Sequence, residues 1–289
     1  MNYRIAIFSG CFLLTAITSI AQNKIVTAAN ASKAYASEGY QLVWADEFNK
    51  DGVPDTSSWS YEKGFKRNHE DQWYQEDNAS CKKGMLVIEG RKESKANPTY
   101  DESSNNWGKK RKTIEYTSSS INTRGKHAWQ YGRFEMRGKI DISSGLWPAW
   151  WTLGVNGEWP ANGEIDIMEY YRNMLLANIA CRAANGKAEW YSVRPSIDSL
   201  GGKTWASQFH VWRMDWDANA IALYVDNQLL NKVSMDKLQN KDGTGINPFN
   251  QPHYMLLNLA IGGDNGGDPS TTKFPNQYEV DYVRVYQKK

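Results

Sequence analysis

The chain has few cysteines and almost no net charge. Its 289 residues include 3 cysteines, and 34 basic residues against 32 acidic ones leave a formal charge of +2. So few cysteines exclude a disulfide-stapled scaffold, and the balanced charge provides no basic field for nucleic acid. Long hydrophobic runs are also scarce, and a mean hydropathy of −0.67 excludes a multispanning membrane protein. The four histidines and three cysteines show no zinc-binding spacing.

Aromatic residues, in contrast, are abundant. The chain has 13 Trp, 16 Tyr and 8 Phe. Indole rings stack on the apolar faces of ligands, sugar rings among them, and they also fill protein cores. The length allows one large domain with a substantial core.

The first 21 residues differ from everything after them. They carry one charge, an almost wholly apolar run over residues 5–20, and the small residues of Ser19-Ile20-Ala21 at their end. This is typical of a secretory signal peptide cleaved after Ala21, and the run is short for a membrane span. We therefore expect secretion to the periplasm or the exterior. Lipidation of Cys11 is the alternative, although it would leave apolar residues on the mature chain.

The mature chain divides into a short Ala-, Ser- and Asn-rich tether, residues 22–38, and one folded domain, residues 39–289. Apolar and polar residues alternate in short segments of this domain, for example over 133–140 and 221–225, and turn-forming residues separate them. The only helical signal is a possible turn over 234–239. The pattern predicts an all-β fold, a two-sheet sandwich or jelly roll. Cys81 and Cys181 are left unpaired.

Three acids follow one another in the segment Gly163 to Tyr171. Glu164 and Asp166 share one face of a strand, whereas strict alternation puts Glu169 on the other. A β-bulge between Asp166 and Glu169 would return all three to one face. The two glutamate carboxyl groups would then stand roughly 5 Å apart, the separation that retaining glycosidases need for a nucleophile and a general acid.

The acid pattern alone is weak, because a solvated edge strand also explains it. Its surroundings strengthen the interpretation. Ile165, Ile167 and Met168 anchor the opposite face in a core, and Leu146-Trp147-Pro148-Ala149-Trp150-Trp151 and Glu158-Trp159-Pro160 precede the acids. Carboxylates beside several indoles indicate a sugar cleft.

The sequence resembles glycoside hydrolase family 16 over nearly the whole mature chain. The resemblance rests on five segments in family order, which are Leu42 to Asn49, Tyr131 to Arg137, Leu146 to Trp151, the acid motif, and Val280 to Tyr286. It implies a β-jelly roll of two antiparallel sheets with an open concave cleft, and a polysaccharide as the binding partner. It also implies Glu164 as nucleophile, Glu169 as general acid and then base, and Asp166 between them, with no cofactor needed for catalysis. We further expect a monomer.

The six-residue form of the acid motif resembles the bulged branch of the family, with laminarinases, agarases, carrageenases and porphyranases. Two segments depart from its laminarinases. Where they carry Thr-x-His, this chain reads Ala177 to Arg182, and where they carry Gly-Gly-x-Trp-Pro-Gly, it reads Gly262 to Pro269. These departures weaken the case for plain β-1,3-glucan.

Four residues are candidates for substrate binding. Trp147, Trp159 and Trp190 can stack on sugars or fill the core, and Arg133 can donate to a sugar or form an outward strand charge. The resemblance also implies a structural calcium held by Glu47, Asp281 and the carbonyl of Gly84, since oxygen ligands suit a hard cation.

The sequence therefore predicts a secreted, retaining endo-β-glycosidase. The expected substrate is β-1,3 or mixed β-1,3/1,4-glucan, and the alternative is a β-galactose-containing chain, either algal galactan or host glycan. The run from Lys109 to Lys112 is a solvated loop or a contact for sulfate groups on such a chain. The sequence also fits a noncatalytic carbohydrate-binding protein or a transglycosylase on the same fold.

Overall fold

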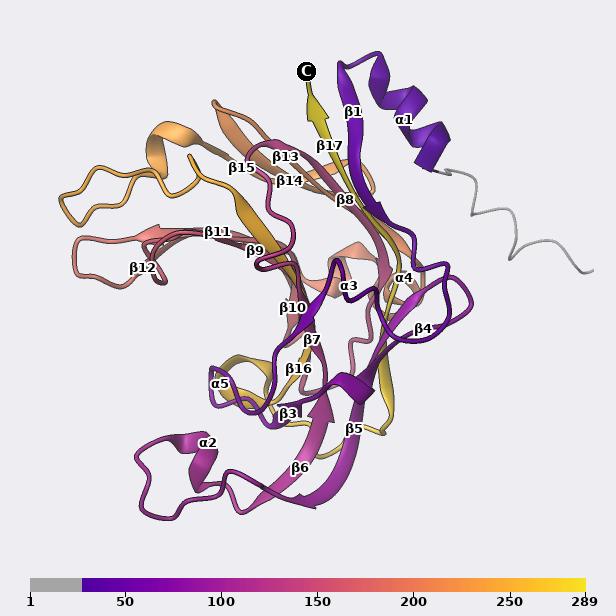
Figure 1. Ribbon diagram of the computed structural model, residues 1–289, viewed down its shortest axis with the longest axis vertical. Coiled ribbons are helices and arrows are strands. Elements are labelled where there is room, and N and C mark those ends of the chain that lie inside the picture. The colour runs from indigo at the N-terminus through magenta and orange to yellow at the C-terminus, as the bar shows by residue number, and fades with distance from the viewer. Residues whose placement is uncertain (1–27) are drawn as a thin grey trace, which may run out of the picture.

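Two β-sheets packed face to face form the body of the molecule (Figure 1). The computed structural model describes residues 28–289, so the signal peptide predicted over residues 1–21 and its cleavage site lie outside the described residues. Most of the secondary structure in these residues is β-strand, and the predicted all-β sandwich is confirmed.

The larger sheet has ten strands. These are β1 (Tyr40–Asp46), β3 (Gln72–Tyr74), β4 (Ala79–Cys81), β5 (Leu86–Ala96), β6 (Thr113–Ser118), β8 (Gly132–Lys139), β13 (His210–Trp216), β14 (Ala220–Val225), β15 (Gln228–Ser234) and β17 (Asn276–Lys288). Their order is β15-β14-β13-β8-β17-β5-β6-β3, with β1 paired to β17 and β4 to β5. All pairings are antiparallel except that of β3 with β6, which is parallel.

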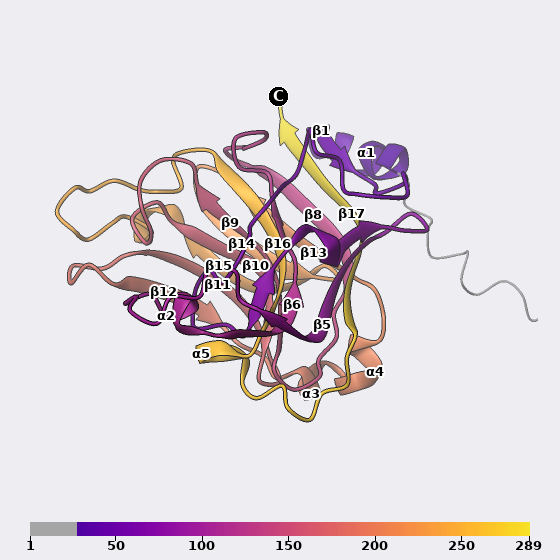
Figure 2. The same ribbon diagram turned by 60° about the horizontal axis from the view of Figure 1, so that its bottom comes forward.

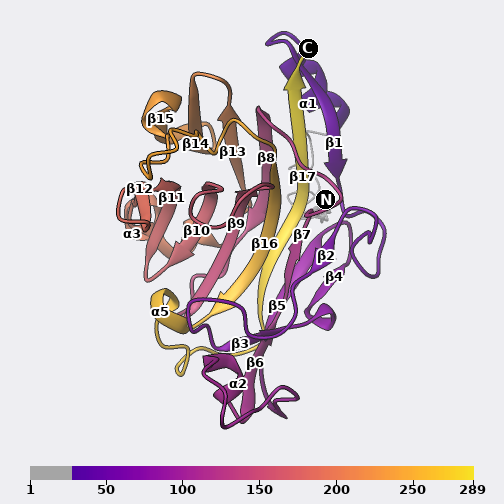
Figure 3. The same cartoon turned by 60° about the vertical axis from the view of Figure 1, so that its left-hand side comes forward.

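The second sheet has seven strands, and Figure 3 shows them side by side. These are β2 (Ser60–Tyr61), β7 (Ser120–Asn122), β9 (Leu146–Gly154), β10 (Glu164–Tyr171), β11 (Met174–Arg182), β12 (Ala188–Val193) and β16 (His253–Ile261). Their order is β12-β11-β10-β9-β16-β7-β2. The acid motif lies on β10, near the middle of this sheet.

Helices are short and peripheral. They are α1 (Ala28–Ala36), α2 (Trp107–Lys110), α3 (Ile197–Leu200), α4 (Gly202–Ala206), α5 (Gly263–Gly266) and the 3-10 turns η1 (Glu76–Asn78) and η2 (Met235–Lys237). The turn expected over residues 234–239 is therefore present, and α3 and α4 lie together at one end of the sandwich (Figure 2). No helix in residues 28–289 has the length and apolar character needed to cross a membrane.

The core lies between the sheets. β10 contributes Ile165 and Ile167, and β13 of the facing sheet contributes Trp212 and Met214, all fully buried. Burying each such side chain stabilises the fold by about 1.5 to 3 kcal/mol. Because side chains alternate along a strand, this inward packing turns Glu164 and Asp166 toward the outer face of the seven-stranded sheet.

The segment expected to be a tether contains helix α1. Its alanine-rich composition favours a helix, and Tyr35 fastens it to the larger sheet through a 2.5 Å hydrogen bond from its hydroxyl to Glu135. Residues 28–36, which the sequence assigned to the tether, therefore form a helix that packs on the folded domain. Cys81 and Cys181 are both buried and unpaired.

Candidate active site

A β-bulge brings the three acids of β10 onto one face. The pairing of β10 with β11 matches Asp166 to Asn178 and then Glu169 to Leu176, with the register shifting in between. The pairing with β9 shifts over the same stretch. Glu164, Asp166 and Glu169 consequently line a single pocket of about 50 Å³. The bulge predicted from the sequence is confirmed.

Each carboxyl group in the pocket accepts a hydrogen bond. The indole N–H of Trp159 donates to Oε2 of Glu164 at 2.5 Å, and that of Trp147 donates to Oε1 of Glu169 at 2.7 Å. Asn178 on β11 donates from Nδ2 to Oδ2 of Asp166 at 3.0 Å and to Oε2 of Glu169 at 2.9 Å. These donors hold the carboxyl groups in fixed orientations.

The surroundings separate the proton affinities of the three acids. Burial raises the pKa of Glu169 to about 7, and the negative charge of Glu164 adds to the effect. Burial also raises the pKa of Asp166 well above its usual value, with the neighbouring charges of Glu169 and Glu164 adding to it. Burial raises the pKa of Glu164 as well, but hydrogen bonds from Trp159 and from Asp166 oppose the rise. Near neutral pH, Glu169 can therefore carry a proton for donation.

The three candidate tryptophans lie on the face that carries the acids. Trp147 is almost completely buried and lines the pocket. Trp159 is 53% exposed and Trp190 is 41% exposed. The register matches Glu164 to Ala180 and Ala180 to Trp190, and residues directly opposite in antiparallel strands share a face. Trp159 and Trp190 thus present exposed indoles beside the acids.

Arg133 does not belong to this site, and its assignment to substrate binding is wrong. It lies on β8 in the other sheet, where its guanidinium donates to both oxygens of Asp215 at 2.7 and 3.0 Å and to Glu38 at 3.1 Å. Tyr35 and Tyr40 pack on it, with ring centroids 4.4 and 4.6 Å from its Cζ. The side chain is buried because the rings of Tyr35 on α1 and Tyr40 on β1 cover it.

The residues implied for calcium do not form an open cation site. Both oxygens of Glu47 accept from Arg284, at 2.7 and 2.9 Å, and Asp281 accepts from Arg137 at 2.8 Å. Guanidinium groups thus engage both acids. Residues 28–289 contain no cluster of three or more metal-ligating side chains from His, Cys, Asp and Glu. The arrangement does not fit the calcium implied for Glu47, Gly84 and Asp281.

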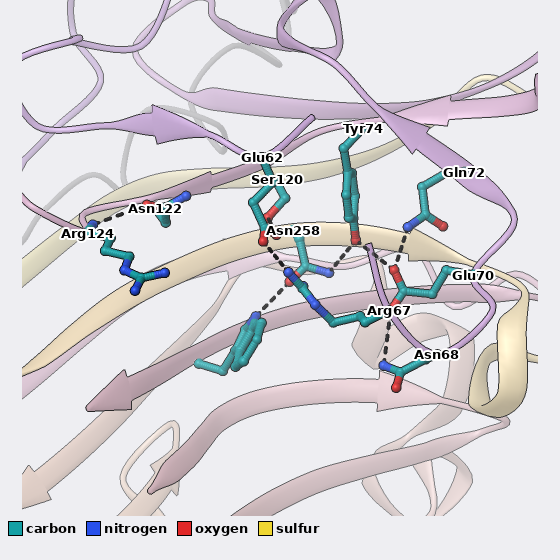
Figure 4. Close-up of polar contacts among 11 residues, drawn as sticks. Glu62, Arg67, Asn68, Glu70, Gln72, Tyr74, Ser120, Asn122, Arg124 and Asn258 are labelled. Atoms are coloured by element: carbon teal, nitrogen blue, oxygen red, sulfur yellow. Dashed lines mark hydrogen bonds and ion pairs between the residues drawn. The ribbon is translucent and has the colours of Figure 1, made fainter. Parts of the chain in front are cut away.

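Six further residues line the pocket that the sequence did not single out for this role. They are Arg67, Asn68, Glu70, Ala149, Trp151 and Asn258. Figure 4 shows how the first three approach from the segment before β3. Their positions depend on a loop that reaches the seven-stranded sheet, so strand alternation carries no signal for them. In the sequence, Asn178 stands out only as part of a departure from the laminarinase pattern, yet it contacts two of the acids.

Both departures from the laminarinase pattern lie at the site. Ala180 stands directly opposite Glu164 in the β10–β11 pairing. The loop that replaces Gly-Gly-x-Trp-Pro-Gly forms α5, and a Cβ at Gly266 would be 3.7 Å from the side chain of Trp147. Both segments that depart from the laminarinase pattern therefore lie close to the reacting groups.

Comparison with known proteins identifies the family and the relatives. The model of the family "Glycosyl hydrolases family 16" matches residues 68–284. A beta-glucanase from Rhodothermus marinus is 35% identical over 269 residues, covering 86% of this chain and 85% of the relative.

Solved structures are similar over almost the same range. One is described with endo-acting O-glycanases that prominent members of the human gut microbiota express to initiate mucin breakdown. It is 34% identical with a TM-score of 0.78, covering 87% of this chain and 92% of that chain. The laminarinase catalytic domain from Thermotoga maritima MSB8 is 34% identical with a TM-score of 0.72, covering 86% and 99%.

Proposed function

The chain belongs to glycosyl hydrolase family 16, and from this membership we propose that Glu164 and Glu169 catalyse a double displacement within a β-linked glycan. The protein is an endo-acting glycoside hydrolase of this family. The observation that carries the assignment of residues is the bulge, because it places both glutamates and Asp166 in one pocket.

In the first step, an oxygen of Glu164 attacks the anomeric carbon as the bond from that carbon to the leaving oxygen breaks. Glu169 gives its proton to the leaving oxygen. A pKa of about 7 suits Glu169 to this role, since the group holds a proton near neutral pH and can still release it. A hydrogen bond from Asp166 to Glu164 lowers the pKa of the nucleophile and so favours its ionised form.

In the second step, Glu169 is a carboxylate and takes a proton from water. The water oxygen attacks the anomeric carbon, and the bond to Glu164 breaks. The two inversions together retain the configuration. A sugar hydroxyl in place of water would give transglycosylation by the same path, and the products distinguish the two outcomes.

We favour a β-galactose-containing chain of the host-glycan or galactan type as the polymer. Ala180, a residue with a small side chain, stands directly opposite Glu164, and the axial 4-hydroxyl of galactose projects out of the ring and needs room beside the reacting groups. The similarity to an O-glycanase structure, at a TM-score of 0.78, supports the same class.

A β-1,3 or mixed β-1,3/1,4-glucan, which the sequence favoured, is the second candidate. It is supported by the relatives described as a beta-glucanase and a laminarinase, which match over most of this chain. Neutral glucans also suit a pocket bordered by exposed indoles.

Digestion of a defined panel tests the assignment. Laminarin, lichenan, agarose, porphyran, keratan and mucin O-glycans would be incubated with the enzyme, and the products identified by mass spectrometry over time. We expect oligosaccharides from galactose-containing chains. Cleavage confined to glucans would establish the second candidate. Inactivity on every polymer would contradict both, and early release of monosaccharide would contradict cleavage within the chain.

A further inference from the structure

Arg67 holds an unusual place in the acid pocket. Of the ten residues in the described structure that line the pocket, it alone carries a positive charge, whereas Glu70, Glu164, Asp166 and Glu169 are acids. A cation so close to the reacting groups needs a partner or a function.

Two contacts hold the Arg67 guanidinium in place. Its Cζ lies 5.2 Å from the ring centroid of Trp151, within the range of a cation–π interaction. Its Nη2 donates to Oε1 of Glu62, and Oε2 of Glu62 accepts at 2.7 Å from the hydroxyl of Ser120 on β7 (Figure 4). Trp151 therefore holds the flat face of the guanidinium, and Glu62 holds its Nη2 edge, before any substrate binds.

The rest of the guanidinium remains available. An arginine side chain has five N–H donors, and among the described residues only Nη2 is engaged, by Glu62. The side chain is 27% exposed and borders the pocket. A rigid fork of donors beside a nucleophile is suited to binding oxygen atoms of a ligand.

We propose that Arg67 is a specificity-determining residue whose free N–H groups bind oxygen atoms of an uncharged sugar seated beside Glu164. This inference rests on the proposed function, because it assumes that the acids act on a glycan in this pocket.

The charges around Arg67 favour a neutral sugar over a sulfated or carboxylated one. Glu62 already balances the guanidinium, and the remaining charged groups of the pocket are acids. An anionic substituent would meet like charges there, which disfavours its binding. The lysine-rich segment Lys109 to Lys112 does not line the pocket, so it supplies no compensating charge at this point.

Two variants test the role of Arg67. Arg67→Met keeps the aliphatic stem and removes the donors, and Arg67→Lys keeps the charge. The matched control is Arg213→Met, because Arg213 also packs on an aromatic ring, Tyr224 at 4.1 Å, but lies on β13 of the other sheet. The values of kcat and KM would be measured on the polysaccharide that the wild type cuts, in a sulfated and an unsulfated form. The pair is keratan sulfate and its desulfated form, or laminarin sulfate and laminarin.

We expect Arg67→Met to lower kcat/KM on the unsulfated polymer roughly 10- to 100-fold and Arg67→Lys to recover part of the loss. Arg213→Met should retain wild-type kinetics. Equal kinetics of Arg67→Met and wild type would overturn the proposal, and so would a loss confined to the sulfated polymer, since Arg67 would then recognise an anion. If Arg67→Met fails to fold, wild-type kinetics of Arg67→Lys on both polymers would overturn it. Inactivity of the wild type on all polymers would instead contradict the proposed function.

Discussion

Trp147 on β9 and Glu169 on β10 are joined by a hydrogen bond of 2.7 Å from the indole N–H to Oε1. The bond favours the ionised carboxylate, while burial favours the neutral acid and has the larger effect, so the pKa of Glu169 is raised to about 7. The indole of Trp147 thus helps to set the pH at which Glu169, the proton donor of the site, loses its proton.

Trp147→Phe should move the alkaline limb of the pH–rate profile to higher pH. Glu169 must be protonated for the first step, so activity falls as pH rises through its pKa. Losing a hydrogen bond worth about 1 kcal/mol to the ionised form would displace the limb by about 0.7 pH unit. The measurement is kcat/KM from pH 4 to 10. Trp151→Phe is the control, because its indole donates to Asn258 and not to an acid. An unmoved limb would show that Trp147 does not influence the proton donor.

Trp159→Phe should move the acidic limb to higher pH. The Trp159 indole donates to Glu164 and thereby opposes the rise in the pKa of the nucleophile that burial causes. Without that donor, the pKa of Glu164 rises further, so the carboxylate forms only at higher pH. The same profile measures it, with Trp190→Phe as an exposed tryptophan on the same face. If the acidic limb of Trp159→Phe were identical to that of Trp190→Phe, the Trp159 indole would not influence the pKa of Glu164.

Glu164→Ala should remove the covalent path and lower kcat on the order of 1,000-fold or more, while the fold is retained. Sodium azide should restore turnover on an activated aryl glycoside, giving the glycosyl azide of inverted configuration. Circular dichroism and NMR of the product check the two parts. Hydrolysis of the polymer at the wild-type rate would eliminate Glu164 as the nucleophile.

Glu169→Gln should stabilise the folded protein at alkaline pH. A carboxyl group whose pKa is raised on folding contributes no cost while it is protonated in both states, below about pH 4. Its cost grows as pH rises from about 4.5 to about 7 and is constant at higher pH. The neutral amide avoids this, so we expect a gain of roughly 1 to 3 kcal/mol at pH 8 and almost none at pH 4. Urea unfolding at the two pH values measures the gain, with exposed Glu102→Gln as the control. Equal gains at both pH values would refute the linkage.

The mature protein should begin at Gln22, because we propose that the chain is exported and cleaved after Ala21. Mass spectrometry of the N-terminal peptide of secreted protein decides the matter. A lipid-modified Cys11 at the terminus would replace both the cleavage site and the free, secreted form.

The amino-acid sequence was sufficient for the β-sandwich and for the acid strand. Alternation along β10 separates Ile165 and Ile167 from Glu164 and Asp166, and the extra residue before Glu169 requires a bulge. Both are local properties of one strand, and a period of two is readable without knowledge of the partner strands.

Alternation cannot say which sheet a strand joins or what covers it. Arg133 sits in a polar strand position as a substrate-binding residue would, yet its strand is in the other sheet, where Asp215 and Glu38 neutralise it. Arg67 reaches the acids from a loop, where no periodicity applies, and Glu47 and Asp281 form ion pairs with Arg284 and Arg137. These outcomes depend on contacts between residues about 80 to 240 positions apart, which only the packed tertiary structure brings together.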